Sequence, residues 1–129
     1  KHDADMVALA GYLKRVPVPV VVAFRQQIVN IHPALLPAFG GHGMFGHHVH
    51  EAVLASGAKV SGATVHLVDE EYDRGPIVAQ RCVPVLPDDT PETLAARVLT
   101  VEHILYPETL AAFARGCVRV DGQRAWIIP

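Results

Sequence analysis

Short, near-continuous runs of apolar residues alternate along the chain with polar and glycine-rich stretches. Four such runs predict strands, at Met6–Ala10, Ile28–Ile31, Thr64–Val68 and Ile77–Val85. Because these runs lack a regular alternation of apolar and polar positions, they are typical of strands that are buried on both faces, as in a parallel sheet. Together with the helical segments between them, they predict an α/β fold with a mainly parallel sheet.

Two segments have the features of helices. His47–Ser56 follows the glycine-rich loop Ala38–Gly46, and Gly57 suits the left-handed residue that ends many helices. A second helix is predicted after Thr90, a preferred N-cap residue, with Pro91 at the first helical position. Its apolar residues recur every three or four positions, at Leu94, Val98, Val101 and Leu105.

The remaining segments carry weaker patterns. Val20–Gln27 is predicted to be helical up to the second strand. Pro107 is expected to kink or break the long helix because proline lacks a backbone N–H, and Arg115-Gly116 is expected to end it. Val118–Ile128 predicts a closing hairpin around Asp121-Gly122, since that dipeptide tolerates the positive φ angles of a type I′ turn.

Length, charge and cysteine content narrow the class of protein. The 129 residues, half of them apolar, suffice for one domain with its own core. A net charge of −2 argues against a nucleic-acid or anionic membrane partner, which leaves small polar substrates. The early apolar run Val16–Phe24 contains two prolines and is too short to cross a bilayer. Cys82 and Cys117 form no CxxC pair, which favours a reducing cytoplasm.

Polar residues stand at the end of the second predicted strand. Asn30 and His32 are two positions apart, so on a strand their side chains point to the same face, and Pro33 then ends the strand. Asp73 follows in the motif Asp73-Arg74-Gly75-Pro76. An amide can donate to a developing oxyanion, an imidazole can exchange a proton near neutral pH, and a carboxylate can stabilise the imidazolium. Together these groups are suited to acyl transfer.

No nucleophilic side chain accompanies this trio. The sequence has no GxSxG motif and no Ser or Cys beside a His, so direct attack by a substrate amine is favoured over a covalent acyl-enzyme. A purely structural interpretation stays open, in which Asn30 forms a turn, His32 is a satisfied residue at a strand end and Asp73 is an ordinary turn aspartate.

These motifs resemble the signature of the folate-dependent formyltransferases. The resemblance rests on Asn30-Ile31-His32-Pro33, Leu35-Leu36-Pro37 and Asp73-Arg74-Gly75-Pro76-Ile77, and shorter matches follow in order along nearly the whole chain. The pattern is most similar to the branch that transfers a formyl group from 10-formyltetrahydrofolate to the amine of glycinamide ribonucleotide (GAR) in purine synthesis, without a metal. The resemblance implies a Rossmann-like formyltransferase fold, a cis Leu36-Pro37 peptide bond, small-molecule partners and, as one open oligomeric state, a homodimer.

The resemblance also implies a role for individual residues. His32 would donate and accept the proton, Asn30 would bond the formyl oxygen, and Asp73 would favour the protonated form of His32. Pro33 and Glu102 would contact the ribonucleotide. The residues expected to contact the folate are Leu13, Lys14, Arg15, Val16, Asn30, Asp69, Glu70, Glu71, Tyr72 and Asp73.

Departures from the family pattern leave alternatives open. The phosphate-binding GxGSN loop of the family is absent, so we interpret the chain as the C-terminal two thirds of a single formyltransferase domain, truncated at its N-terminus, that binds GAR poorly by itself. A formyltetrahydrofolate deformylase, a methionyl-tRNA formyltransferase and a non-catalytic folate-binding fragment are the alternatives. The tRNA enzyme would be expected to show an Arg-Gly-rich stretch after Leu36-Pro37, where this chain has Ala38-Phe39-Gly40-Gly41.

The other histidines do not have the spacing of a metal site. His42, His47, His48 and His50 would straddle a glycine-rich loop and a helix start, so no metal site is expected. His66, in the middle of a strand, is either a buried and satisfied histidine or a partner beside the trio. His103 is expected to be exposed.

Overall fold

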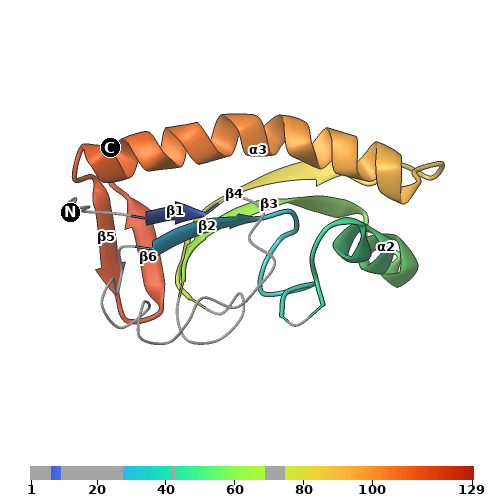
Figure 1. Ribbon diagram of the computed structural model, residues 1–129, viewed down its shortest axis with the longest axis horizontal. Coiled ribbons are helices and arrows are strands. Elements are labelled where there is room, and N and C mark those ends of the chain that lie inside the picture. Colours follow the sequence, from blue (N-terminus) through green and yellow to red (C-terminus); the bar gives the residue numbers. More distant parts are fainter. Residues whose placement is uncertain (1–6, 10–27, 42, 69–74) are drawn as a thin grey trace.

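The computed structural model describes residues 7–9, 28–41, 43–68 and 75–129. In this part of the chain six strands form one sheet, and the long helix α3 (Pro91–Ala114) runs along one face of it (Figure 1). The shorter helix α2 (His47–Ser56) lies beside one end of the sheet and contacts α3. The predicted α/β class is therefore confirmed.

The sheet is mixed rather than mainly parallel. Its strand order is β1-β2-β3-β4-β6-β5, where the strands are β1 (Val7–Leu9), β2 (Ile28–His32), β3 (Val60–Leu67), β4 (Ile77–Pro84), β5 (Val118–Asp121) and β6 (Arg124–Ile127). Among the described strands, the β1–β2 and β4–β6 pairs are parallel and the other three pairs are antiparallel. The prediction took continuous apolar runs as a sign of parallel strands. Strand β3 is buried at every position from Ser61 to Leu67, so an antiparallel strand here also shows such a run.

Most of the predicted elements are found close to their expected bounds. The first two strands, helix α2 with its left-handed C-cap Gly57, and β4 all match the prediction. Strand β3 begins at Val60, four residues before the predicted start, because Ser61 and Gly62 pair with β4 although neither residue favours a strand by itself. The predicted helix Val20–Gln27 lies outside the described residues.

Helix α3 continues through Pro107, so the predicted break is absent, while the alternative of a kink stays a prediction. The missing N–H of Pro107 leaves the carbonyl of His103, one turn earlier, without a helical partner. Both residues are exposed, so water can satisfy this carbonyl and the helix does not have to end there. The N-terminus follows the prediction, since the side chains and backbones of Thr90 and Thr93 form a reciprocal capping box.

The C-terminal hairpin is formed by β5 and β6 as predicted, but its turn is not of type I′. A type I′ turn needs a positive φ at both central residues. Here Gly122 has a φ of 61°, whereas Gln123 is not among the residues with positive φ. The turn therefore has the pattern of type II′, in which glycine occupies the first central position.

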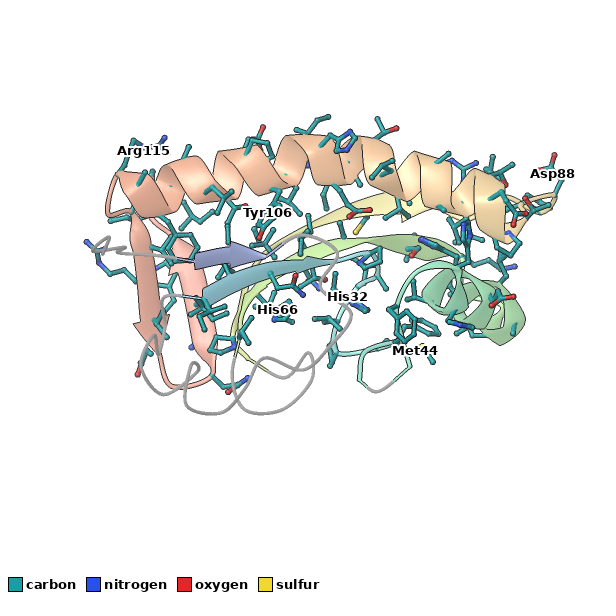
Figure 2. All side chains as sticks on the ribbon, viewed as in Figure 1. His32, Met44, His66, Asp88, Tyr106 and Arg115 are labelled. Atoms are coloured by element: carbon teal, nitrogen blue, oxygen red, sulfur yellow. The ribbon has the colours of Figure 1, made fainter. Side chains whose placement is uncertain are left out.

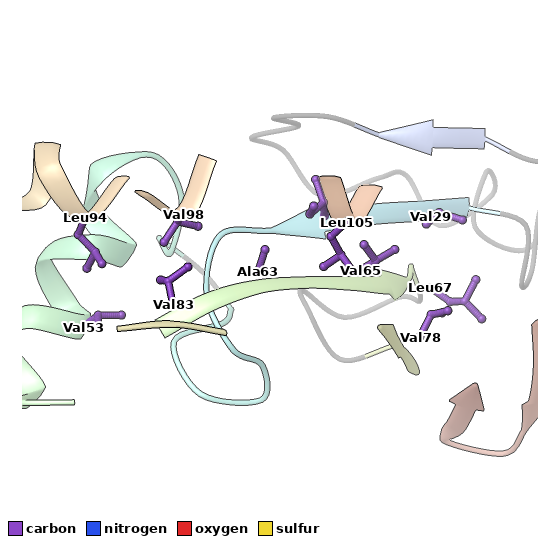
Figure 3. Close-up of a cluster of buried hydrophobic side chains, with 11 residues drawn as sticks. Val29, Val53, Ala63, Val65, Leu67, Val78, Val83, Leu94, Val98 and Leu105 are labelled. Carbon is purple, nitrogen blue, oxygen red and sulfur yellow. The ribbon is translucent and has the colours of Figure 1, made fainter. Parts of the chain in front are cut away.

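The hydrophobic core lies between the sheet and α3 (Figure 3). Strands β2 and β3 contribute Val29 and Val65, which pack with Leu105 of α3, while Val53 of α2 joins the same cluster near Leu94. Because this face of β3 is filled by apolar side chains, its polar side chains have to point to the opposite face. In the described part of the chain, no helix is both long and apolar enough to span a membrane.

Candidate active site

The candidate site lies at the end of β2, on the sheet face opposite α3. His32 is 3% exposed and Asn30 is half-buried, and the alternation of strand side chains places both on this face, as predicted. Figure 2 shows His32 and His66 on the side of the sheet away from α3. Strand β1 runs parallel to β2, with Leu9 paired to Asn30, so the two strands end at the same edge.

Strand β3 places two buried polar residues directly beside this pair. In the antiparallel register Asn30 is opposite His66 and His32 is opposite Thr64. Thr64 and His66 are 0% and 2% exposed. Cross-strand neighbours of this kind have Cβ atoms about 5 Å apart, which is close enough for their side chains to interact.

His66 fixes the orientation of the Asn30 amide. The Nδ1 atom of His66 lies 3.1 Å from the carbonyl oxygen of Leu67, and a carbonyl only accepts, so Nδ1 carries the proton. In the neutral ring Nε2 is then an acceptor, and the Asn30 Nδ2 atom donates to it over 3.4 Å. Among the two possibilities left open for His66, the structure places it beside Asn30. The second N–H of the Asn30 amide remains for another acceptor.

Among the described residues, none bonds the opposite end of the Asn30 amide. Its Oδ1 atom is buried and has no hydrogen-bond partner among the described residues. Buried polar atoms of this kind are uncommon, and an unpaired one is often found where a ligand supplies the missing bond. Asn30 therefore offers both a donor and an acceptor at the end of β2.

His32 is held by the backbone of the following loop. Its Nε2 atom donates to the carbonyl oxygen of Phe39 over 2.8 Å, because that oxygen only accepts. In the neutral imidazole Nδ1 is then the nitrogen without a proton. This arrangement gives a base with a defined tautomer next to an oriented amide, which suits proton transfer combined with oxyanion stabilisation.

The α2 helix places further histidines near His32. Burial lowers the pKa of His50, and the nearby His47 and His32 lower it further. His50 is 4% exposed, and its ring centroid lies 6.4 Å from that of His47. In the described part of the chain no three His, Cys, Asp or Glu side chains are arranged to hold a metal ion. The absence of a metal stays a prediction.

Glu102 and Pro33 are the two residues predicted to contact the ribonucleotide. Glu102 lies on α3, which covers the other face of the sheet, and burial raises its pKa while the neighbouring His103 partly offsets this effect. Pro33 directly follows β2 and is half-buried. His103 is exposed, as predicted. Substrate contacts of Pro33 and Glu102 stay predictions.

Several predicted site residues lie outside the described part of the chain. These are Leu13, Lys14, Arg15, Val16, Asp69, Glu70, Glu71, Tyr72 and Asp73, so the expected contact between Asp73 and His32 stays a prediction. The predicted cis Leu36-Pro37 bond is present. Sequence analysis missed Phe39 and Thr64, although the spacing of Thr64 and His66 in one strand indicated a shared face.

The chain was compared with known proteins. Residues 1–110 match the family described as formyl transferase. The chain is 61% identical over 124 residues to the chloroplastic phosphoribosylglycinamide formyltransferase of Vigna unguiculata, an alignment that covers 95% of this chain and 40% of that protein. It thus spans about two fifths of the length of this curated relative.

Solved structures agree with the sequence comparison. Glycinamide ribonucleotide transformylase 1 from Symbiobacterium toebii matches with a TM-score of 0.89 and 45% identity, over 97% of this chain and 57% of that chain. A formyltetrahydrofolate deformylase from Pseudomonas syringae matches with a TM-score of 0.87 and 31% identity, over 98% of this chain and 41% of that chain. The Rossmann-like formyltransferase fold is therefore shared by proteins that are named for different reactions.

Proposed function

Since the chain belongs to the formyl transferase family, we propose that it carries the catalytic residues of an enzyme that transfers a formyl group to GAR. The donor is 10-formyltetrahydrofolate, and the reaction serves purine synthesis. The observation that carries the proposal is the pair of Asn30 and His32 at the end of β2, each held in one orientation by a neighbouring group. The alignment covers 40% of the Vigna unguiculata protein, so the activity of a complete enzyme is part of the proposal.

The proposed reaction gives a role to Asn30, His32 and Asp73. The amine of GAR attacks the formyl carbon, and the second N–H of the Asn30 amide donates to the oxyanion that forms. His32 takes the proton of the amine at Nδ1 and passes it to the folate nitrogen as the carbon–nitrogen bond of the donor breaks. Asp73 is proposed to stabilise the imidazolium form in between. The products are formylated GAR and tetrahydrofolate, so atoms and protons balance.

The remaining contacts belong to the same proposal. The folate is proposed to lie against Leu13–Val16 and the loop Asp69–Asp73, and the ribonucleotide against Pro33 and Glu102. A homodimer and a cytoplasmic location are further predictions, and the Vigna unguiculata relative is named as a chloroplast protein. The net charge of −2 gives no support for a nucleic-acid substrate, which weakens the methionyl-tRNA alternative.

The deformylase is the strongest alternative because it shares the fold at a TM-score of 0.87. In that reaction water takes the place of the amine, so the same amide and imidazole would be needed. Sequence similarity favours the GAR enzyme, since identity is 61% to the Vigna unguiculata relative and 31% to the deformylase. Measuring formate release without GAR would detect the deformylase reaction directly.

The test is a formyl-transfer assay with 10-formyltetrahydrofolate and GAR, in the complete protein that contains this chain. We expect His32→Ala to lower kcat by about 10² to 10⁴ and Asn30→Ala by about 10² to 10³, with folate binding retained, because both groups act in the transition state. His48→Ala is the matched control, since His48 is an exposed histidine of α2 that pairs with Glu51. Full turnover in the His32→Ala enzyme, or formate release that does not depend on GAR, would overturn the proposal.

A further inference from the structure

Three polar side chains form one row across the middle of the sheet. His32 of β2 is the register partner of Thr64 of β3, and Thr64 is the register partner of Gln80 of β4. Directly paired residues share a face, so the row lies on the face of the candidate site. Thr64 and Gln80 both form hydrogen bonds to the loop that follows His32.

The hydroxyl of Thr64 uses its full hydrogen-bonding capacity at this loop. It donates to the carbonyl of Ala34 over 2.7 Å and accepts from the backbone N–H of Leu36 over 3.0 Å. Its second lone pair accepts from Gln80 Nε2 over 3.0 Å. One donor and two acceptor positions are all that a hydroxyl has, so this buried group is completely satisfied.

The amide of Gln80 has only one orientation that satisfies both of its partners. Its Nε2 atom donates to the carbonyl of Leu36 over 2.9 Å and to the Thr64 hydroxyl. Because the Thr64 proton already goes to Ala34, the hydroxyl can only accept from Gln80. Together, Thr64 and Gln80 supply the hydrogen bonds that a neighbouring strand would otherwise give to the backbone of Ala34 and Leu36.

This loop leads directly to the group that holds His32. Phe39, three residues after Leu36, presents the carbonyl that accepts the Nε2 proton of His32. Phe39 has a φ of 57°, which is uncommon for a residue other than glycine and persists only where the surroundings impose it. Its ring packs against the core cluster on one side, and the bonds of Thr64 and Gln80 hold the chain just before it.

We propose that Thr64 and Gln80 are positioning residues, which hold the Ala34–Phe39 loop so that the Phe39 carbonyl selects the Nε2–H tautomer of His32. Nδ1 then becomes the nitrogen that exchanges a proton with the substrate. The catalytic consequence rests on the proposed function, whereas the effect on the tautomer does not.

The test reads the tautomer directly. In protein with 15N-labelled histidine rings, we expect the neutral His32 to show the Nε2–H form, with its signals identified by their loss in a His32→Gln variant. Thr64→Val removes the hydroxyl at nearly constant shape and should populate both tautomers of His32. Thr64→Ser is the matched control, because it keeps the hydroxyl and should keep the Nε2–H form.

A second variant, Gln80→Met, tests the same proposal if Thr64→Val does not fold. Gln80 is exposed, so Gln80→Met should fold while losing both donated bonds, and it should shift the tautomer in the same direction. In the complete protein each of these losses should lower kcat about tenfold, the effect of roughly one hydrogen bond, with little change in the KM for folate. An unchanged His32 tautomer in every folded variant would overturn the inference.

The two proposals fail in different ways. If the wild-type protein transfers no formyl group but the tautomer shifts as expected, the proposed function fails and the positioning role of Thr64 and Gln80 stands. If formyl transfer is normal in folded Thr64→Val and Gln80→Met and the tautomer is unchanged, only the positioning role fails.

Discussion

The side-chain amide of Asn30 has a donor nitrogen and an acceptor oxygen, and its neighbour His66 determines that the nitrogen faces His66. The proton on His66 Nδ1 is fixed by the carbonyl of Leu67, so Nε2 accepts from the Asn30 amide nitrogen. Without that acceptor the amide could rotate by 180° and turn its oxygen to where its nitrogen now lies. The chemistry proposed for Asn30 therefore depends on a second residue, His66.

We expect His66→Leu to lower kcat in the complete protein by about 10 to 100, because Asn30 would present a correctly placed N–H only part of the time. Complete loss of one oxyanion donor costs about 10² to 10³, which sets the upper limit. His66→Gln keeps a polar acceptor and should recover part of the rate, while the KM for folate should change little in both variants. Unaltered kcat in a folded His66→Leu protein would show that Asn30 needs no such support.

Of the residues in the candidate site, the sequence predicted the two on β2, Asn30 and His32. The two-residue spacing of Asn30 and His32 was enough to place both on one face, because strand side chains alternate. The partners His66 and Thr64 depend on the register between β2 and β3, which is set by long-range packing and is not visible in either segment alone. For the same reason the role of the Phe39 carbonyl could not be predicted.

Among the helices and strands, the N-terminal end of α3 is joined to the end of β4 by hydrogen bonds of the buried Asp89 carboxylate and of Arg97. Asp89 accepts from both terminal nitrogens of Arg97, over 2.7 and 2.9 Å, and from the backbone N–H of Leu86. Its side chain is only 2% exposed. Arg97 also donates to the carbonyl of Pro84, so one ion pair joins the helix, the connecting turn and the strand.

These bonds predict how the stability of the protein depends on pH. The hydrogen bond from Arg97 is the largest of the effects that hold the pKa of Asp89 well below its usual range. The unfolded chain therefore takes up a proton at Asp89 below about pH 4, while the folded chain does not, and the free energy of unfolding falls as the pH decreases. We expect Arg97→Met to reduce this acid dependence.

Urea denaturation between about pH 2 and pH 6 would measure this effect. The stability difference between wild type and Arg97→Met should be largest at pH 6 and should shrink toward pH 2, where Asp89 is protonated in the unfolded wild type. Arg81→Met is the control, because the ion pair of Arg81 with Glu108 is solvent-exposed and should contribute little. A stability difference that does not change with pH would contradict the assignment.

Local signals predicted the elements well, whereas the pairing of strands needed information from the whole chain. The capping residues Thr90 and Gly57 act within a few positions, so the ends they predict were found. The direction of β3 could not be read from its composition, because a strand buried on both faces looks the same in a parallel and an antiparallel sheet. Gly62 illustrates the point, since a Cβ atom there would approach the backbone oxygen of Arg81 and lie 2.9 Å from Leu35.

At the scale of the whole molecule, the described sheet carries the proposed proton-transfer and oxyanion groups but only part of the proposed substrate surface. Asn30 and His32 of β2 lie opposite His66 and Thr64 of β3, on the face away from α3. The family's phosphate-binding loop, a GxGSN motif, is absent from the 129 residues. The chain covers 57% of the glycinamide ribonucleotide transformylase from Symbiobacterium toebii, which leaves room in that protein for such a loop.

We therefore expect the chain of residues 1–129 to bind GAR much more weakly than the complete protein does, while a folate analogue binds the two with similar affinity. A phosphate held by two charge-assisted hydrogen bonds gains roughly 3 kcal/mol, which corresponds to about a 100-fold difference in Kd. Isothermal titration of both proteins with GAR and with the folate analogue would measure the two affinities separately. Glycinamide, which lacks the ribose phosphate, serves as the control ligand, because it should bind both proteins equally poorly. Equal affinity for GAR in the two proteins would mean that residues 1–129 already hold the phosphate, and the separation of catalytic groups from the phosphate site would be wrong.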